Sequence, residues 1–141
     1  MHALIVDDDG FIREVARLSL EITGGWAVSV AESGSDGIDQ ARTLAPDVIL
    51  LDVMMPGIDG VETMRSLSID PATRDIPVIF LTAKTQACEQ QRIDESGALG
   101  LITKPFDPLS LAHEVEMILG TAQRRTSQHQ RTAGTVTRAP R

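Results

Sequence analysis

Apolar positions along the chain fall into short strand-like runs separated by longer stretches with helical spacing. Largely apolar runs at residues 3–6, 26–30, 48–51, 78–81 and 99–103 predict five strands. The third and fourth runs are apolar at every position, which is typical of central parallel strands covered on both faces. The pattern therefore favours a buried parallel sheet.

Each run is followed by a stretch with helical character. Apolar residues at helical spacing predict the first helix, which should end at Gly24-Gly25: Phe11, Val15, Leu18 and Ile22. A second helix must stop before Pro46, and Asp59 with Glu62 three residues later predicts the start of a third. The fourth, at about 86–96, has few large apolar residues. The last is predicted from Leu111, Ala112, Val115, Ile118 and Leu119.

Five such units predict an α/β fold, a parallel sheet doubly wound with five helices. Residues 1–122 are expected to form this one domain, while the polar, Arg-rich residues 123–141 are expected to be a disordered tail or linker. Ligands of such sheets bind beyond the carboxyl ends of the strands. The residues directly after the predicted strands are therefore the candidates for chemistry.

Polar side chains follow four of the five predicted strands. Each has an ordinary explanation: an Asp caps the next helix, as we expect of Asp9, a Thr belongs to its strand, and a Lys is solvated. Their coincidence on one sheet edge favours a shared site over these separate explanations. The candidates are Asp7, Asp8, Asp52, Thr82 and Lys104.

Carboxylates brought this close repel one another unless a cation joins them. A hard cation with oxygen ligands fits, and we expect Mg²⁺, for which Mn²⁺ could substitute. A carboxylate can also act as a nucleophile toward phosphorus, with a lysine and a hydroxyl binding the phosphoryl oxygens. The residue types therefore predict phosphoryl transfer to an Asp.

Four segments, residues 5–9, 50–60, 80–83 and 103–106, resemble the signature segments of two-component response-regulator receiver domains. The resemblance covers about residues 2–120 and includes the spacing between the segments. It implies the strand order 2-1-3-4-5 of a flavodoxin-like receiver fold. It also implies a signalling domain that catalyses only its own phosphorylation and slow dephosphorylation, and so is not otherwise an enzyme.

The resemblance implies a role for each site residue. Asp52 would be the phosphoacceptor, and Asp7 and Asp8 would hold the metal with Asp52 and the Met54 backbone carbonyl. Thr82 and Lys104 would contact the phosphoryl group, and the bond between Lys104 and Pro105 is expected to be cis. The donor would be a histidine kinase or a histidine phosphotransfer protein. Phosphorylation would then shift a conformational equilibrium that controls a protein-binding surface.

Two features depart from the usual family pattern. Leu101 occupies the strand position where the family usually has an aromatic switch residue, and the chain contains no tyrosine. Coupling from Thr82 to an output surface is therefore expected to be weakened or replaced. Met54 and Lys84 occupy the positions that flank the hydrolytic water, and neither is suited to orient it. We therefore expect a long-lived phosphoryl group.

The charge and the length of the chain limit the kinds of partner that it is expected to bind. The first 120 residues contain all 20 acidic and eight of the 13 basic residues, a net charge of −12, whereas the last 21 contain five arginines and no acid. The acidic part argues against direct nucleic-acid binding. We expect a cytoplasmic protein without membrane segments, as a monomer or a weak phosphorylation-dependent dimer. It is either free-standing or the receiver part of a longer regulator with a separate output domain.

Two other classes share part of the pattern. A haloacid-dehalogenase-type phosphatase also uses a nucleophilic Asp, but it needs an acid two residues later, where this chain has Met54. A flavodoxin-like cofactor binder needs a hydroxyl-rich loop after the first strand, where this chain has three acids. Both classes are disfavoured. A coloured purified protein would indicate a bound flavin and would favour the second class.

Overall fold

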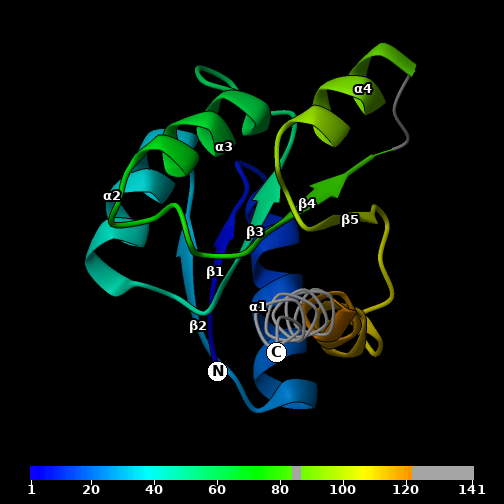
Figure 1. The fold of residues 1–141 in the computed structure, drawn as a ribbon. Helices are drawn as coiled ribbons and strands as arrows, with labels where there is room; N and C mark the ends of the chain where they lie inside the picture. Colours follow the sequence, from blue (N-terminus) through cyan, green and yellow to red (C-terminus); the bar gives the residue numbers. More distant parts are fainter. Residues whose placement is uncertain (84–86, 122–141) are drawn as a thin grey trace, which may run out of the picture.

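The predicted strands form one parallel sheet in a computed structural model of the chain, which describes residues 1–83 and 87–121. The strand order is β2-β1-β3-β4-β5. Strands and helices alternate (Figure 1) with these bounds: β1 (His2–Val6), α1 (Gly10–Gly24), β2 (Ala27–Ala31), α2 (Gly34–Leu44), β3 (Val48–Asp52), α3 (Gly60–Ile69), β4 (Val78–Thr82), α4 (Ala87–Glu95) and β5 (Gly100–Thr103). A last helix spans residues 111–121. The predicted fold class and strand order are confirmed.

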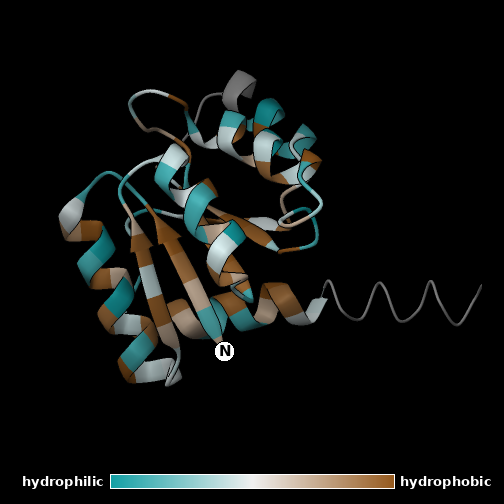
Figure 2. Cartoon of the chain, turned by 90° about the vertical axis from the view of Figure 1, so that its left-hand side faces the viewer, coloured by the Kyte–Doolittle hydropathy of each residue, from teal (hydrophilic) through white to brown (hydrophobic). Residues whose placement is uncertain are grey.

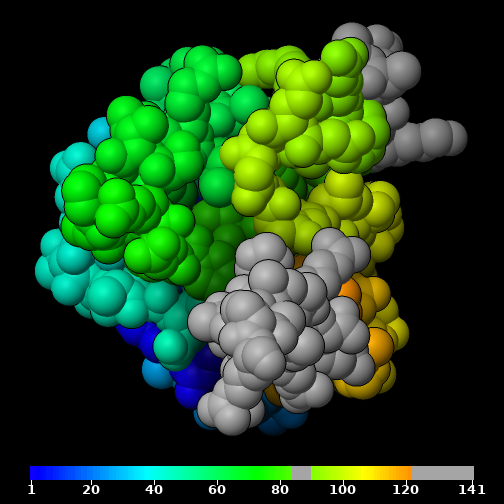
Figure 3. Space-filling view, viewed as in Figure 1, coloured from blue at the N-terminus to red at the C-terminus, as the bar shows by residue number. Residues whose placement is uncertain are grey.

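The sheet has a hydrophobic core on each face because successive strand side chains point to opposite sides. Leu4, Ile49 and Phe80 pack with residues of α2, α3 and α4. Ile5 and Leu50 pack with α1 and the last helix. The strands are apolar along most of their length, between helices of mixed character (Figure 2). On the face shown in Figure 3, α2 and α3 lie side by side and a hollow separates α3 from α4.

The predicted helix ends are confirmed. The Asp9 side chain accepts hydrogen bonds from the backbone N–H groups of Phe11 and Ile12, which caps α1. Gly25 follows this helix with a φ of 69°, a left-handed conformation that glycine adopts without steric cost. Asp59 accepts from the N–H of Glu62 at 2.9 Å and starts α3.

The apolar spacing that predicts α1 does not mark its buried face. Phe11 and Ile22 are 74% and 76% exposed, whereas the buried residues of this helix are Ala16, Ser19 and Leu20. Small side chains let a helix approach its neighbours closely, and the Ser19 hydroxyl donates to the Pro108 carbonyl across the interface. The pattern thus locates the helix correctly but not the side that packs.

Two sequence predictions fall outside the described residues: the tail at 123–141 and the role of Lys84. Within the described residues, no helix is both long and apolar enough to cross a membrane.

Candidate functional site

The strand register brings the predicted site residues to one edge of the sheet. Val6 of β1 pairs with Leu51 of β3, so the next residues, Asp7 and Asp52, lie at the ends of neighbouring strands. Thr82 ends β4 and pairs with Thr103 of β5. The edge is therefore built by the parallel pairing of β1, β3, β4 and β5.

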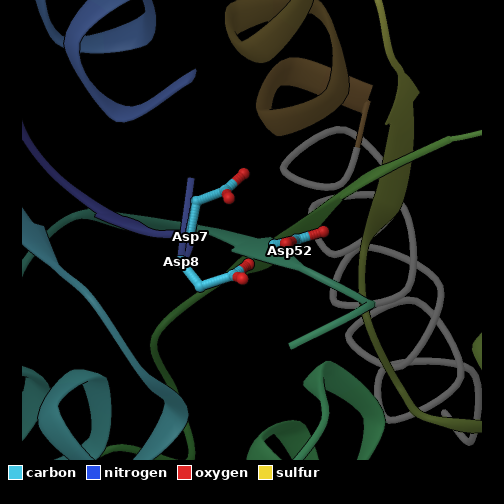
Figure 4. A group of neighbouring side chains, drawn as sticks. All are labelled: Asp7, Asp8 and Asp52. Carbon is cyan, nitrogen blue, oxygen red and sulfur yellow. The ribbon is translucent and has the colours of Figure 1, made fainter. Parts of the chain in front are cut away.

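Three carboxylates meet at this edge and form what we call the carboxylate cluster: Asp7, Asp8 and Asp52. Each offers an oxygen that lies within 4.8 Å of the others. Figure 4 shows the three side chains as neighbours at the ends of β1 and β3. Asp7 is completely buried and Asp52 is 5% exposed, whereas Asp8 faces solvent. Two buried acids and one accessible acid thus share one small region.

Lys104 supplies a positive charge to the cluster. Its Nζ lies 2.6 Å from Asp7 Oδ2 and 3.1 Å from Asp52 Oδ1. The Lys104 backbone N–H donates to the Thr82 carbonyl at 2.7 Å, which continues the β4–β5 pairing beyond the strands. The peptide bond from Lys104 to Pro105 is cis. Lys104, directly after strand β5, therefore bridges the two buried acids at the ends of β1 and β3.

Burial and charge act in opposite directions on the acids and the lysine. Burial, followed by the negative charge of Asp7, raises the pKa of Asp52 to about 6, although Lys104 and the Met54 N–H oppose this rise. Burial tends to lower the pKa of Lys104, but its contacts with Asp7 and Asp52 outweigh this and raise it. A single lysine therefore does not offset the electrostatic cost of ionising Asp52.

The carboxylate cluster has the composition of a site for a hard cation. It offers oxygen donors from three separate acids, and one lysine leaves negative charge in excess. Hard divalent cations prefer such oxygen ligands. The residues present therefore fit a metal ion.

Backbone and side-chain contacts fix Asp7 in place. Its Oδ1 accepts from the backbone N–H of Asp9 at 2.9 Å, and its carbonyl accepts from Arg13 Nη1 at 2.8 Å. Arg13 also lies 3.6 Å from Glu32. Sequence reasoning did not identify Arg13, because an arginine in the first turn of a helix carries no pattern that distinguishes it from a solvated residue.

The remaining predicted residues are less directly engaged. Thr82 is buried at the same edge, and its hydroxyl donates to the Ala83 carbonyl at 2.9 Å. The backbone N–H of Met54 donates to Asp52 Oδ1 at 3.3 Å, and Met54 itself is 65% exposed. Leu101 is partly buried and packs against the core under α2, α3 and α4.

The raised pKa of Asp52 predicts how the unfolding free energy of the protein depends on pH. Since the folded protein holds this proton more tightly than the unfolded chain, metal-free stability should fall as pH rises from about 4 to about 6. Asp52→Asn removes that loss and should stabilise the protein by on the order of 2 kcal/mol at neutral pH. Urea unfolding of both proteins in chelator, across this range, measures the difference. A gain that is independent of pH, or largest in acid, would contradict the assignment.

The doubly wound sheet and its acidic edge with a partly buried lysine define a class of phosphoacceptor signalling domains. The chain matches the response regulator receiver domain family over residues 3–116 and belongs to it.

Curated relatives support this membership. Transcriptional regulatory protein CseB of Streptomyces coelicolor is 40% identical over 118 residues, which cover 84% of this chain and 49% of that protein. Phosphate regulon transcriptional regulatory protein PhoB of Escherichia coli is 38% identical over 116 residues, covering 82% and 50%. The chain thus spans about half the length of these relatives.

Solved structures agree with the fold. Chemotaxis protein CheY4 of Vibrio cholerae superposes with a TM-score of 0.77 at 29% identity, covering 83% of this chain and 97% of that one. The N-terminal domain of a response regulator receiver protein from Methanoculleus marisnigri gives 0.68 at 38% identity, covering 84% and 95%.

Proposed function

We propose that this receiver domain accepts a phosphoryl group on Asp52 from a phosphohistidine of a histidine kinase or a histidine phosphotransfer protein. The observation that supports this most is the position of Asp52 at a strand end, with Asp7, Asp8 and Lys104 around it. Lone acids at strand ends are usually helix caps. Asp52 instead ends its strand eight residues before α3 begins, and it is Asp59 that caps that helix.

In the proposed step, one carboxylate oxygen of Asp52 attacks the phosphorus of the donor. The phosphorus–nitrogen bond breaks, and the imidazole leaves with its electron pair and takes a proton from solvent. Both described contacts of the Asp52 carboxylate, from Lys104 and the Met54 N–H, are made to Oδ1, so Oδ2 is the oxygen that the described residues leave for attack. Lys104, which contacts Asp52 Oδ1, would neutralise charge on the transferred group.

Asp7, Asp8 and Asp52 would hold Mg²⁺, with the Met54 carbonyl as a further ligand. When bound, the ion would neutralise charge on the phosphoryl oxygens. The Thr82 hydroxyl, which donates to Ala83 here, would have to turn to reach the phosphoryl group.

We further propose that the domain acts on no separate substrate, so its output is a protein contact. The curated relatives are named as transcriptional regulators, and the chain spans about half of each. The alternative to a free-standing receiver is therefore that this chain is the receiver half of such a regulator. A cytoplasmic location and a monomeric or weakly dimeric state stay predictions.

A small phosphodonor such as acetyl phosphate tests the proposal. Intact mass after incubation should show one added phosphoryl group with Mg²⁺ and little with chelator, and none on Asp52→Asn. Asp39→Asn, an exposed acid on α2, is the matched control and should label like the parent. Equal labelling of the Asp52 variant and the parent would overturn the proposal. Removing the donor then tests the long-lived phosphoryl group, since loss within seconds would contradict that expectation.

A further inference from the structure

The open edge of the sheet at β5 carries a groove that the phosphoryl-transfer site does not use. Strand β5 pairs only with β4 among the described strands, so its outer edge leaves backbone groups free to pair with another segment. Between β5 and the last helix lies a hollow of about 580 Å³, a volume typical of ligand sites. We call it the β5 groove. Its apolar and acidic lining includes Leu101, Phe106, Met117, Ile118, Asp107 and Glu114.

The groove combines an apolar floor with negative charge. Asp107 and Glu114 are both exposed, and none of the described residues that line the groove is a lysine or an arginine. Leu101, at the position where the family usually has an aromatic residue, is only partly buried. The groove therefore suits a basic segment with small or apolar side chains between its charges.

We propose that residues 122–141 of this chain dock in the β5 groove, with arginines against Glu114 and Asp107. These residues carry five arginines and no acid, while residues 1–120 carry a net charge of −12. They also begin directly after the last helix, which forms one wall of the groove. Opposite charges and covalent continuity thus favour docking of this segment in the groove over docking elsewhere on the domain.

The geometry of the chain permits this docking. Glu114 lies seven residues before residue 121 on the helix, a distance of about 10 Å along the axis. Four extended residues span up to about 13 Å, so Arg124 and Arg125 are within reach of Glu114 when the chain turns back. A tethered segment also has an effective concentration of about millimolar. Docking therefore needs only weak intrinsic affinity.

Docking there would have a consequence for signalling. A segment in the β5 groove would cover Leu101 and the exposed side of the last helix, and a partner protein that binds this surface would first have to displace it. The tail would thus compete intramolecularly with any partner protein that binds the β5 groove. This inference does not depend on whether Asp52 is phosphorylated.

Paramagnetic relaxation enhancement on the full chain tests the proposal. A nitroxide is attached at Ser127→Cys after the single native cysteine is replaced, Cys88→Ala. Amide signals of residues 101–104, 106 and 113–118 should lose intensity several-fold relative to those of β2, at the opposite edge of the sheet. Salt should restore them, since exposed ion pairs are screened. Losses spread evenly over the domain, or centred on the carboxylate cluster, would overturn the proposal.

Charge variants sharpen the result. Glu114→Lys should weaken the effect at the groove, whereas Asp39→Lys, an exposed acid on α2, should leave it unchanged. Equal effects of the two variants would show general attraction to an acidic surface and would contradict a specific groove. Mixing isotope-labelled chains without nitroxide with unlabelled chains that carry it detects binding between copies. Signal loss in that mixture equal to the loss in the single chain would also overturn the intramolecular proposal.

Discussion

Replacing Lys104 with Met is expected to lower the unfolding free energy of the metal-free protein by about 3–5 kcal/mol at neutral pH, the usual cost of removing one partner of a buried ion pair. The lysine side chain is 17% exposed and contacts Asp7 at 2.6 Å and Asp52 at 3.1 Å. Methionine has a similar length but no charge, so two buried carboxylates would then face each other without a cation. The loss should shrink in acid, where Asp52 takes up a proton.

Chemical unfolding in chelator measures this loss. Arg42→Met is the matched control, because Arg42 pairs with Asp70 at an exposed position where ion pairs contribute little. The double variant Lys104→Met/Asp52→Asn should recover much of the lost stability, since it removes one of the unpaired charges. If Lys104→Met costs no more than Arg42→Met, or if the double variant is no more stable than Lys104→Met alone, the ion-pair account of the site is wrong.

The sheet was predictable from sequence because each strand is a contiguous, largely apolar run with turn-forming or helix-capping residues next to it. Runs such as 48–51 and 78–81 have no polar position, and both are completely buried on either face of the sheet. Helix ends were predictable for the same local reason, as Gly25 and Asp59 show. The residues that form each element therefore largely specify where it begins and ends.

The packing of α1 was not predictable in this way. Two of its large apolar residues, Phe11 and Ile22, are exposed, while Ala16, Ser19 and Leu20 pack inward. Which side faces the core depends on the shape of the sheet and of the loop at Pro108, which is 89 residues away from Ser19 in the sequence. A one-dimensional pattern contains no information about that contact.

The same distinction applies to the site. That Asp7, Asp8, Asp52, Thr82 and Lys104 share an edge follows from parallel pairing alone. Arg13 Nη1 at the Asp7 carbonyl and the bridging position of Lys104 depend on side-chain geometry. Sequence therefore predicts the chemical groups of the site, and the structure is needed for how they are paired.

Gly60→Ala is expected to destabilise the protein by about 3 kcal/mol or more and to slow phosphorylation of Asp52, because overpacking against fixed atoms is costly. A Cβ at residue 60 would lie 2.2 Å from the Asp52 carbonyl oxygen and 2.7 Å from the Val53 Cα. Both are backbone atoms, and the Gly60 N–H also donates to the Val53 carbonyl at 2.8 Å. Neither side can yield without moving the segment that carries Asp52.

Thermal or urea unfolding and labelling by acetyl phosphate together test this expectation. Gly120→Ala is the control, because a Cβ there meets no atom within 4 Å and lies in a helix, where alanine should add about 0.5–1 kcal/mol. A Gly60→Ala protein as stable as the parent would show that α3 and the Asp52 segment move apart easily. A Gly60→Ala protein that is stable but labels slowly would contradict the predicted loss of stability. It would show that Gly60 affects the orientation of Asp52 and not the stability of the fold.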